Sequence, residues 1–268
     1  MSKKAGNDST QKTLLVTVLL SLVCSVVVSF AAVSLKPLQD QNVVLDVQRN
    51  ILSISGLAQN AKALNSDEIE KLYKQVQPRL VDLKSGKFVQ ATEAEIADFD
   101  QREAAKDPAT SRSLSGTEDI ASINRLESVA KVYLIEKDGK TESIMLPVHG
   151  YGLWSTMYGF LALDINDLET VVGFGFYDQA ETPGLGGEVD NPIWKNRWPG
   201  KKVYNAKGDV ALSVIKGAVD PSNPNAQKQI DGLAGATLTA NGVTNLIQFW
   251  MGSNGFKPFL TNLKAGDA

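Results

Sequence analysis

An uncharged apolar run near the start of the chain limits its architecture more than any other feature. The 23 residues from Thr13 to Leu35 read TLLVTVLLSLVCSVVVSFAAVSL and contain no charge. A helix of about 20 apolar residues is long enough to cross a bilayer. We therefore expect a single transmembrane anchor over residues 13–35, with the rest of the chain folded outside the bilayer.

Basic residues set the expected direction of this anchor. Lys3, Lys4 and Lys12 lie ahead of it, and by the positive-inside rule such residues stay in the cytoplasm. Residues 1–12 are then a cytoplasmic tail. Everything after Leu35 is expected to be exported.

Two processing alternatives stay open for the anchor. It could be a cleaved signal peptide, although the apolar core of such a peptide is usually shorter, about 7–15 residues. It could also carry a lipid on Cys24, although Val23 is larger than the small residue usual before a lipidated cysteine. The uncharged run continues after Cys24, which favours a cysteine inside the helix.

Composition narrows the classes of function. The chain has 27 basic and 30 acidic residues, so it lacks the positive excess of proteins that bind nucleic acid. It has one cysteine, Cys24, and one histidine, His149. A disulfide, a cysteine-ligated zinc or an iron–sulfur cluster within the chain is therefore excluded. Any redox chemistry would need an organic cofactor.

The exported part divides into two stretches of different pattern. Residues 36–125 are expected to be mostly helical and loop. Within them, Asn65 and Glu68 resemble a helix start, and Pro78 ends the apolar stripe that follows. The segment 91–116 is charged and has few apolar residues, so it is predicted to be a solvated, mobile loop.

Residues 126–268 change to a strand-like pattern. Alternating segments at 131–136 and 142–146 flank Asp138-Gly139, which predicts a β-hairpin. Further strands are expected over residues 158–163, 170–177 and 210–215. The sequence thus predicts an α+β domain in which an antiparallel sheet packs with helices.

A run of small residues, DGLAGATLT from Asp231 to Thr239, lies directly before an amphipathic helix. Thr239 is expected to be the N-cap of that helix and Asn254-Gly255 its stop. The apolar face recurs with helical spacing and consists of Val243, Leu246, Ile247, Trp250 and Met251.

The position of Thr237 favours a bound anion. It is expected in the turn ahead of the helix, where unpaired backbone amides and the helix dipole attract a phosphate. Gly235 and Ala236 add little bulk, so a large ligand can approach the backbone closely. The same pattern also fits a tight turn and helix cap that bind nothing.

Two further segments are unusual for simple connections. Residues 147–159 interleave glycines with aromatic residues, and we expect a loop that either packs against a planar ligand or fills the core. ETPGLGGE, at residues 181–188, should form a tight loop whose amides can face a ligand. The single His149 is expected to be structural. The chain has no P-loop, no complete GxGxxG fingerprint and no GxSxG elbow.

Together these features resemble one family. The anchor, the loop HGYGLWSTMYG, the element ETPGLGGE and the final DGLAGATLTANGV are similar to those of the C subunit of the sodium-translocating NADH:quinone reductase. Members of that family carry FMN joined through its phosphate to a threonine, which corresponds to Thr237. Thr239 is the neighbouring rival hydroxyl. The chain departs from the family at Ala234, where serine or threonine is usual, and at Gln179, where histidine is frequent.

The resemblance implies a role as an electron relay. In such complexes electrons from NADH pass through FAD and iron–sulfur centres to the FMN of this subunit, then to another flavin and to ubiquinone, while sodium ions leave the cytoplasm. The implied partners are the iron–sulfur and flavin subunits, a flavin transferase during maturation, and the bacterial inner membrane, with the main domain in the periplasm. Because no charge interrupts the anchor, the sodium path is expected in partner subunits.

The resemblance also implies a set of flavin-binding residues. Thr237 would bear the phosphoester, and Gly235 and Ala236 would give the phosphate room. Residues of two loops would line or border the flavin: Glu181, Thr182, Gly184 and Leu185 from the first, and Leu153, Trp154 and Thr156 from the second. No residue is expected to be catalytic, because a relay needs no acid–base pair of its own.

Two alternatives stay open. One is the corresponding flavoprotein subunit of an Rnf-type electron transport complex, against which the longer chain and the GYGLWSTMYG loop argue. The other is a membrane-anchored sensory or binding domain that uses the same fold without electron transfer.

Overall fold

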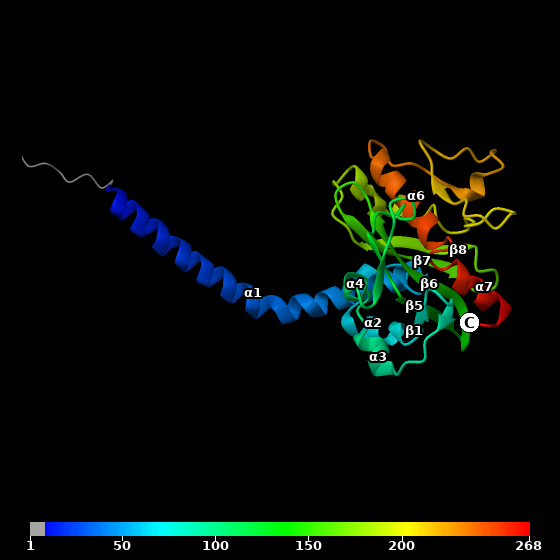
Figure 1. Ribbon diagram of the computed structural model, residues 1–268, viewed down its shortest axis with the longest axis horizontal. Coiled ribbons are helices and arrows are strands. Elements are labelled where there is room, and N and C mark those ends of the chain that lie inside the picture. Colours follow the sequence, from blue (N-terminus) through cyan, green and yellow to red (C-terminus); the bar gives the residue numbers. More distant parts are fainter. Residues whose placement is uncertain (1–8) are drawn as a thin grey trace, which may run out of the picture. The chain divides into compact units, whose positions relative to one another are not determined.

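The computed structural model describes residues 9–268, which form two compact units divided between Asp46 and Val47 (Figure 1). Lys3 and Lys4, on which the predicted direction of the anchor partly depends, lie outside the described residues. The first unit consists of helix. The second unit carries the sheet and every element discussed below as part of a site.

Helix α1 (Thr10–Ile54) contains the predicted anchor and extends well beyond it. The apolar side chains between Thr13 and Leu35 are exposed; Phe30, for example, is 75% exposed. Such a surface suits a lipid environment. Among the described residues, α1 is the one helix long and apolar enough to cross a membrane. Its last turns belong to the second unit, where Ile51 and Leu52 are fully buried.

A six-stranded antiparallel sheet forms the centre of the second unit, in the order β2-β1-β5-β6-β7-β8 (Figure 1). The predicted hairpin is confirmed, because Asp138 and Gly139 join β5 to β6 with positive φ angles of 51° and 75°, as a two-residue primed turn requires. The strands expected at 158–163 and 170–177 are confirmed as β7 and β8. The strands are β1 (Val76–Asp82), β2 (Lys87–Phe88), β5 (Val129–Lys137), β6 (Lys140–Tyr151), β7 (Thr156–Asp164) and β8 (Val171–Asp178).

The prediction of helix and loop for residues 36–125 is wrong at β1. Helix α2 (Ser66–Tyr73) does begin at Asn65, and the capping box with Glu68 is present. After it the chain enters the sheet, and Pro78 lies opposite Tyr133 of β5. A proline is tolerated there because β2 pairs only with Val81 and Asp82, which leaves the other edge of β1 open at Pro78.

The charged segment 91–116 is also more ordered than predicted. It contains α3 (Glu93–Asp98), α4 (Gln101–Lys106) and β3 (Ser111–Ser113), which pairs with β4 (Arg125–Glu127). Thr92 and Glu95 form a capping box, and Asp100 caps α4. Several polar residues of this segment are therefore helix-capping residues, which compositional reasoning assigned to a loop.

Two C-terminal helices cover one face of the sheet. Helix α6 (Thr237–Trp250) packs on β6, and Phe259 of α7 (Lys257–Ala265) meets Phe88 of β2 edge to face, with ring centroids 5.2 Å apart. The predicted stop at Asn254-Gly255 is wrong, because α6 ends at Trp250. The indole Nε1 of Trp250 donates a hydrogen bond of 2.7 Å to the carbonyl oxygen of His149.

The histidine belongs to the packing, as expected. His149 is 9% exposed and stacks on Tyr158, with ring centroids 5.4 Å apart. Burial, with a smaller contribution from Arg102, lowers the pKa of His149 to about 4. The imidazole is therefore neutral at neutral pH.

The remaining elements are short. The strand expected at 210–215 is reduced to β9 (Ser213–Val214), which pairs in parallel with β10 (Gln229–Ile230) outside the main sheet. One further α-helix and the short 3-10 helices complete the fold: α5 (Pro192–Lys195), η1 (Ala61–Ala63), η2 (Gly186–Asp190) and η3 (Ala226–Lys228).

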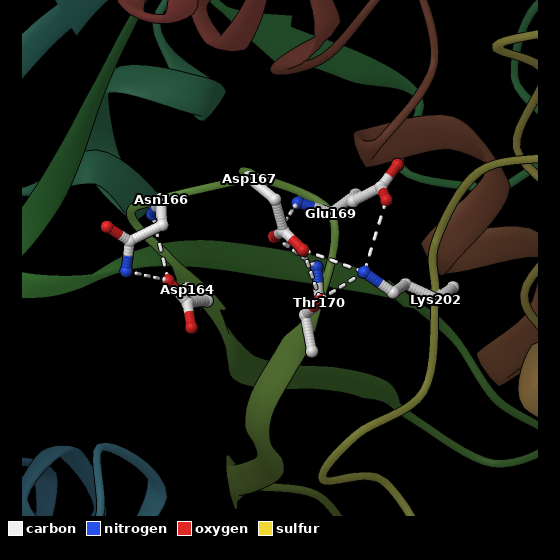
Figure 2. Close-up of polar contacts among 6 residues, drawn as sticks. All are labelled: Asp164, Asn166, Asp167, Glu169, Thr170 and Lys202. Atoms are coloured by element: carbon white, nitrogen blue, oxygen red, sulfur yellow. Dashed lines mark hydrogen bonds and ion pairs between the residues drawn. The ribbon is translucent and has the colours of Figure 1, made fainter.

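A polar cluster fixes the connection between β7 and β8 (Figure 2). The Nζ of Lys202 donates to Asp167 Oδ2 at 2.7 Å, to Glu169 Oε1 at 3.2 Å and to Thr170 Oγ1 at 2.6 Å. Although desolvation opposes it, hydrogen bonding from Lys202 and Thr170 holds the pKa of Asp167 well below its usual range. These groups satisfy one another, so we assign the cluster a structural role.

Candidate functional site

Helix α6 begins without a side-chain cap. Its N-cap is Ala236, and Thr237 is its first residue, so the predictions that Thr239 caps the helix and that Thr237 lies in the preceding turn are wrong. The first amides of a helix have no intrahelical acceptor, and here no side chain caps them. The start of α6 therefore offers backbone N–H groups and the positive end of the helix dipole to an anion.

The two threonines of the motif differ sharply in environment. Thr237 is exposed. Thr239 is 1% exposed, and its hydroxyl donates a hydrogen bond of 2.6 Å to Oε2 of Glu181. Only Thr237 presents a hydroxyl to a large reagent from outside.

Glu181 is the centre of a buried hydrogen-bond network. Its Oε1 accepts from the backbone amides of Trp154 at 2.9 Å and of Leu153 and Ser155 at 3.1 Å each. Burial alone would raise the pKa of the Glu181 carboxyl, but hydrogen bonds from Thr239 and these amides hold it below its ordinary value. The carboxyl is therefore ionised at neutral pH although the residue is only 4% exposed, and it accepts hydrogen bonds from both the hairpin and α6.

Gln179 supports this glutamate from its own loop. Its Oε1 accepts from the backbone amide of Glu181 at 2.6 Å, while its Nε2 donates to Asp190 Oδ2 at 2.7 Å. The hydroxyl of Ser155 accepts from the amide of Ala180 at 2.8 Å. Gln179 thus fixes its own loop by joining Glu181 to Asp190, while Ser155 and Ala180 attach that loop to the β6–β7 hairpin.

Glycines permit the close approach of the three segments. A Cβ on Gly152 would lie 2.6 Å from Glu181 Oε1, and one on Gly186 would lie 2.5 Å from Thr239 Oγ1. A Cβ on Gly242 would lie 2.5 Å from the carbonyl oxygen of Tyr151. At Gly242 the obstacle is backbone, so a side chain there would push the hairpin away from α6. At Gly152 and Gly186 the side chains of Glu181 and Thr239 would have to shift, which would disturb their hydrogen bonds.

The aromatic and glycine-rich segment is mainly strand. Residues 147–151 end β6 and residues 156–159 begin β7, so the prediction of a loop holds only for the four-residue hairpin connection from Gly152 to Ser155. Within this segment His149 and Tyr158 form a cross-strand pair, whereas Tyr151 and Trp154 are exposed.

Large apolar side chains surround the start of α6, and we call them the apolar rim. They come from the hairpin, the ETPGLGG loop and the helix. Each has at least a third of its side-chain surface exposed, unlike a core residue: Tyr151 45%, Leu153 39%, Trp154 66%, Leu185 44% and Leu238 59%. A Cβ built on Gly235 would lie 3.0 Å from Leu185 Cδ2, so the loop and the small-residue motif are in contact. Apolar groups gathered beside an anion site suit a ligand that is planar at one end and charged at the other.

The other predicted residues lie around this rim. Thr182 and Gly184 are exposed, and Thr182 accepts through its carbonyl oxygen from the amides of Leu185 at 3.1 Å and Gly187 at 2.9 Å. Gly184 has a φ of 76°, which the turn requires. Thr156 is half-buried at the start of β7. All the predicted segments are thus brought together, but Glu181 is buried beneath the rim.

Sequence reasoning missed the groups that hold Asp231. Arg197 Nη1 lies 2.7 Å from Asp231 Oδ2, Val219 donates its amide to Oδ1 at 2.8 Å, and Trp194 donates its indole N–H to the Asp231 carbonyl at 2.9 Å. These contacts fix the first residue of the small-residue motif. No local pattern pairs Arg197 with a residue so far along the chain. Within residues 9–268, no group of three or more His, Cys, Asp or Glu side chains is placed to hold a metal ion.

Comparisons with known proteins find close similarity to one family. The model of the FMN-binding domain family matches residues 152–252, from the hairpin tip past the end of α6. The chain is 53% identical to the C subunit of the Na(+)-translocating NADH-quinone reductase of Pseudomonas aeruginosa, over 98% of this chain and 100% of the relative. It is 46% identical to the corresponding protein of Yersinia pestis, over 98% and 97%. The crystal structure of Shewanella oneidensis NqrC is similar, with 34% identity, a TM-score of 0.73, and coverage of 82% of this chain and 96% of that one.

Proposed function

The chain belongs to the family of the C subunit of the Na(+)-translocating NADH-quinone reductase, and on that premise we propose that it carries FMN covalently on Thr237 as an electron relay of this sodium-pumping complex. The FMN-binding domain and membership of a multi-subunit translocase follow from the family. The attachment residue, the direction of the anchor and the sodium-linked role are our proposal.

The observation that carries the attachment is the contrast between the two threonines. Attachment would transfer the FMN phosphoryl group from a flavin dinucleotide to a threonine hydroxyl; the hydroxyl loses its proton as the new O–P bond forms, and the pyrophosphate bond of the dinucleotide breaks to release a nucleoside monophosphate. A transferase must therefore reach the hydroxyl, and Thr237 is exposed while Thr239 is 1% exposed and bonded to Glu181. The uncapped amides of α6 lie beside Thr237. A negative group at such a position gains about 0.3–1 kcal/mol from the helix dipole at an exposed site.

The residues present fit the two ends of FMN. The phosphate end would meet the α6 amides, with room left by Gly235, which has a φ of 71°, and by Ala236. The flat ring would lie against the apolar rim, in which Leu153, Trp154 and Leu185 contribute large exposed surfaces. Thr182, Gly184 and Thr156 would border it.

The role of Glu181 differs from that of a lining residue. Its carboxylate is engaged by the hairpin amides and Thr239, so it shapes the site from below. Bound FMN would supply the capacity to take up and pass on electrons. The protein residues hold the group, exclude water from one side of it and keep it at the surface, where partner subunits can approach.

The anchor completes the proposal. With Lys12 ahead of the apolar run and the sheet domain after it, the positive-inside rule places the domain in the periplasm. A covalent bond would keep the cofactor on an exported domain independently of binding affinity. Because no charge lies between Thr13 and Leu35, the sodium path would belong to partner subunits.

The test is to produce the full chain together with a flavin transferase. The denatured protein should give a fluorescent band under ultraviolet light, and peptide mass analysis should find FMN on Thr237. Thr237→Val should remove the band and Thr237→Ser should retain it, since serine keeps the acceptor hydroxyl. A dark wild-type band, with a control substrate modified in the same cells, would refute covalent attachment; an adduct on Thr239 would refute the assignment of the residue.

A further inference from the structure

One carboxylate joins the three segments that surround Thr237. Oε2 of Glu181 accepts from Thr239 at 2.6 Å and from the amide of Leu153 at 3.1 Å, and Oε1 accepts from Trp154 and Ser155. The two interacting side chains, Glu181 and Thr239, are 4% and 1% exposed. The ETPGLGG loop, the hairpin tip and the first turn of α6 therefore meet at a single buried point.

The position of Thr239 on the helix determines where Thr237 points. Thr237 is the first residue of α6 and Thr239 the third. Side chains two residues apart in an α-helix differ by about 200° around its axis. When Glu181 holds Thr239 inward, Thr237 must therefore face outward, in agreement with its exposure.

The buried contact between Glu181 and Thr239 fixes the orientation of the segments as well as holding them together. A buried carboxylate is costly unless its oxygens are satisfied, and here three amides and one hydroxyl are spent on it. A Cβ on Gly152 or Gly186 would lie 2.6 Å or 2.9 Å from a carboxylate oxygen of Glu181 and would displace it. An apolar pair of similar volume would hold the segments together with fewer constraints but would not define one orientation.

Resting on the proposed attachment at Thr237, we propose that Glu181 and Thr239 are positioning residues that fix the rotation of the first turn of α6 about the helix axis. This rotation presents the Thr237 hydroxyl to the flavin transferase and directs the attached flavin onto the apolar rim. Thr239 is then an essential partner of the acceptor. The Thr239 hydroxyl, by donating to Glu181, keeps the Thr237 hydroxyl accessible.

The experiment measures flavin transfer in the full chain with Thr239→Val and Thr239→Ser. Valine preserves the shape and removes the donor, whereas serine keeps the donor. The matched control is Thr244→Val, because Thr244 also lies on α6 and also hydrogen-bonds, accepting from the amide of Val214 at 3.0 Å and donating to Ala240 at 3.1 Å, away from the apolar rim. The readouts are the initial rate of adduct formation at Thr237 and the visible circular dichroism of the bound flavin, which reports its orientation.

Thr239→Val should slow transfer about tenfold, the effect of losing one hydrogen bond to a charged acceptor, and should change the flavin dichroism. Thr239→Ser and Thr244→Val should match the wild type in both. Equal rates and spectra for Thr239→Val and Thr244→Val would overturn the inference.

Glu181→Gln provides a second route should Thr239→Val not fold. It replaces one acceptor oxygen by an amide and is expected to slow transfer in the same way, while a wild-type rate would again overturn the inference. Failure of the wild type itself to gain FMN on Thr237 is a different result, because it would refute the attachment and not the positioning.

Discussion

Glu127 allows a quantitative test of burial in this fold. The residue lies in β4 and is 1% exposed. Its Oε1 accepts from Gln101 Nε2 at 2.6 Å, and its Oε2 has no partner. Burial raises the pKa of Glu127 from 4.5 to about 7, although hydrogen bonding from its own backbone and from Gln101 opposes the shift.

The sign of the effect on stability follows from proton binding. Between pH 4.5 and about 7 the unfolded chain has lost the proton of Glu127 while the folded chain keeps it, so stability falls as pH rises through this window. The difference between the two pKa values corresponds to about 3 kcal/mol, fully lost above pH 7. The amide that Glu127→Gln introduces cannot ionise. The free energy of unfolding of the variant minus that of the wild type should therefore rise by up to about 3 kcal/mol between pH 4.5 and pH 8.

The assay is urea unfolding of the full chain in detergent at pH 4.5 and pH 8, followed by tryptophan fluorescence. All four tryptophans lie in the second unit, so the signal reports that unit. Taking the difference between variant and wild type at each pH cancels the titration of other groups. The control is Glu93→Gln, because Glu93 is exposed on α3. A difference between Glu127→Gln and wild type that stays constant with pH would refute the reasoning.

Two further predictions follow from other buried positions. His149→Phe should make the protein less sensitive to acid. Burial lowers the pKa of His149 from 6.5 to about 4, so the free energy of unfolding of the wild type falls by about 3 kcal/mol as pH falls through that window. Urea unfolding of the variant between pH 7 and pH 4 should show a correspondingly smaller fall. A wild-type pH dependence in the variant would contradict this. Gly173→Ala should destabilise the second unit by about 1–3 kcal/mol, because its Cβ would lie 2.1 Å from the carbonyl oxygen of Ile54. The control for the loss of glycine is Gly116→Ala, because no atom lies within 4 Å of the new Cβ and the backbone there is not in the left-handed region. Equal effects of the two substitutions would count against the contact.

Local features of the sequence predicted the elements whose causes are local. A run of uncharged residues predicted the helix that contains Thr13–Leu35, because the length of an apolar helix is a property of one segment. Asp138-Gly139 predicted the β5–β6 hairpin, because a two-residue primed turn needs residues that accept positive φ. Asn65 and Glu68 predicted the start of α2 in the same way.

Predictions were wrong where distant contacts outweigh local pattern. Val76 fits the apolar helical stripe that Pro78 was expected to end, yet pairing with β5 draws both residues into the sheet. The short α3 and α4 lack a long apolar face, so only their caps marked them. Strand pairing depends on where the rest of the chain lies, whereas the caps of α3 and α4 are local signals that the charged composition of the segment outweighed in the prediction.

The sequence alone determined the family, the anchor and the small-residue motif that offers a threonine near the start of an amphipathic helix. It left Thr237 and Thr239 as rivals, because both have the same chemistry and lie two residues apart. Only the tertiary structure separates them: Glu181, 58 residues away along the chain, accepts the hydroxyl of Thr239 and buries it. The rotation of a helix about its own axis is set by what it packs against, so the exposure of Thr237 was decided by the folded hairpin and loop beneath it.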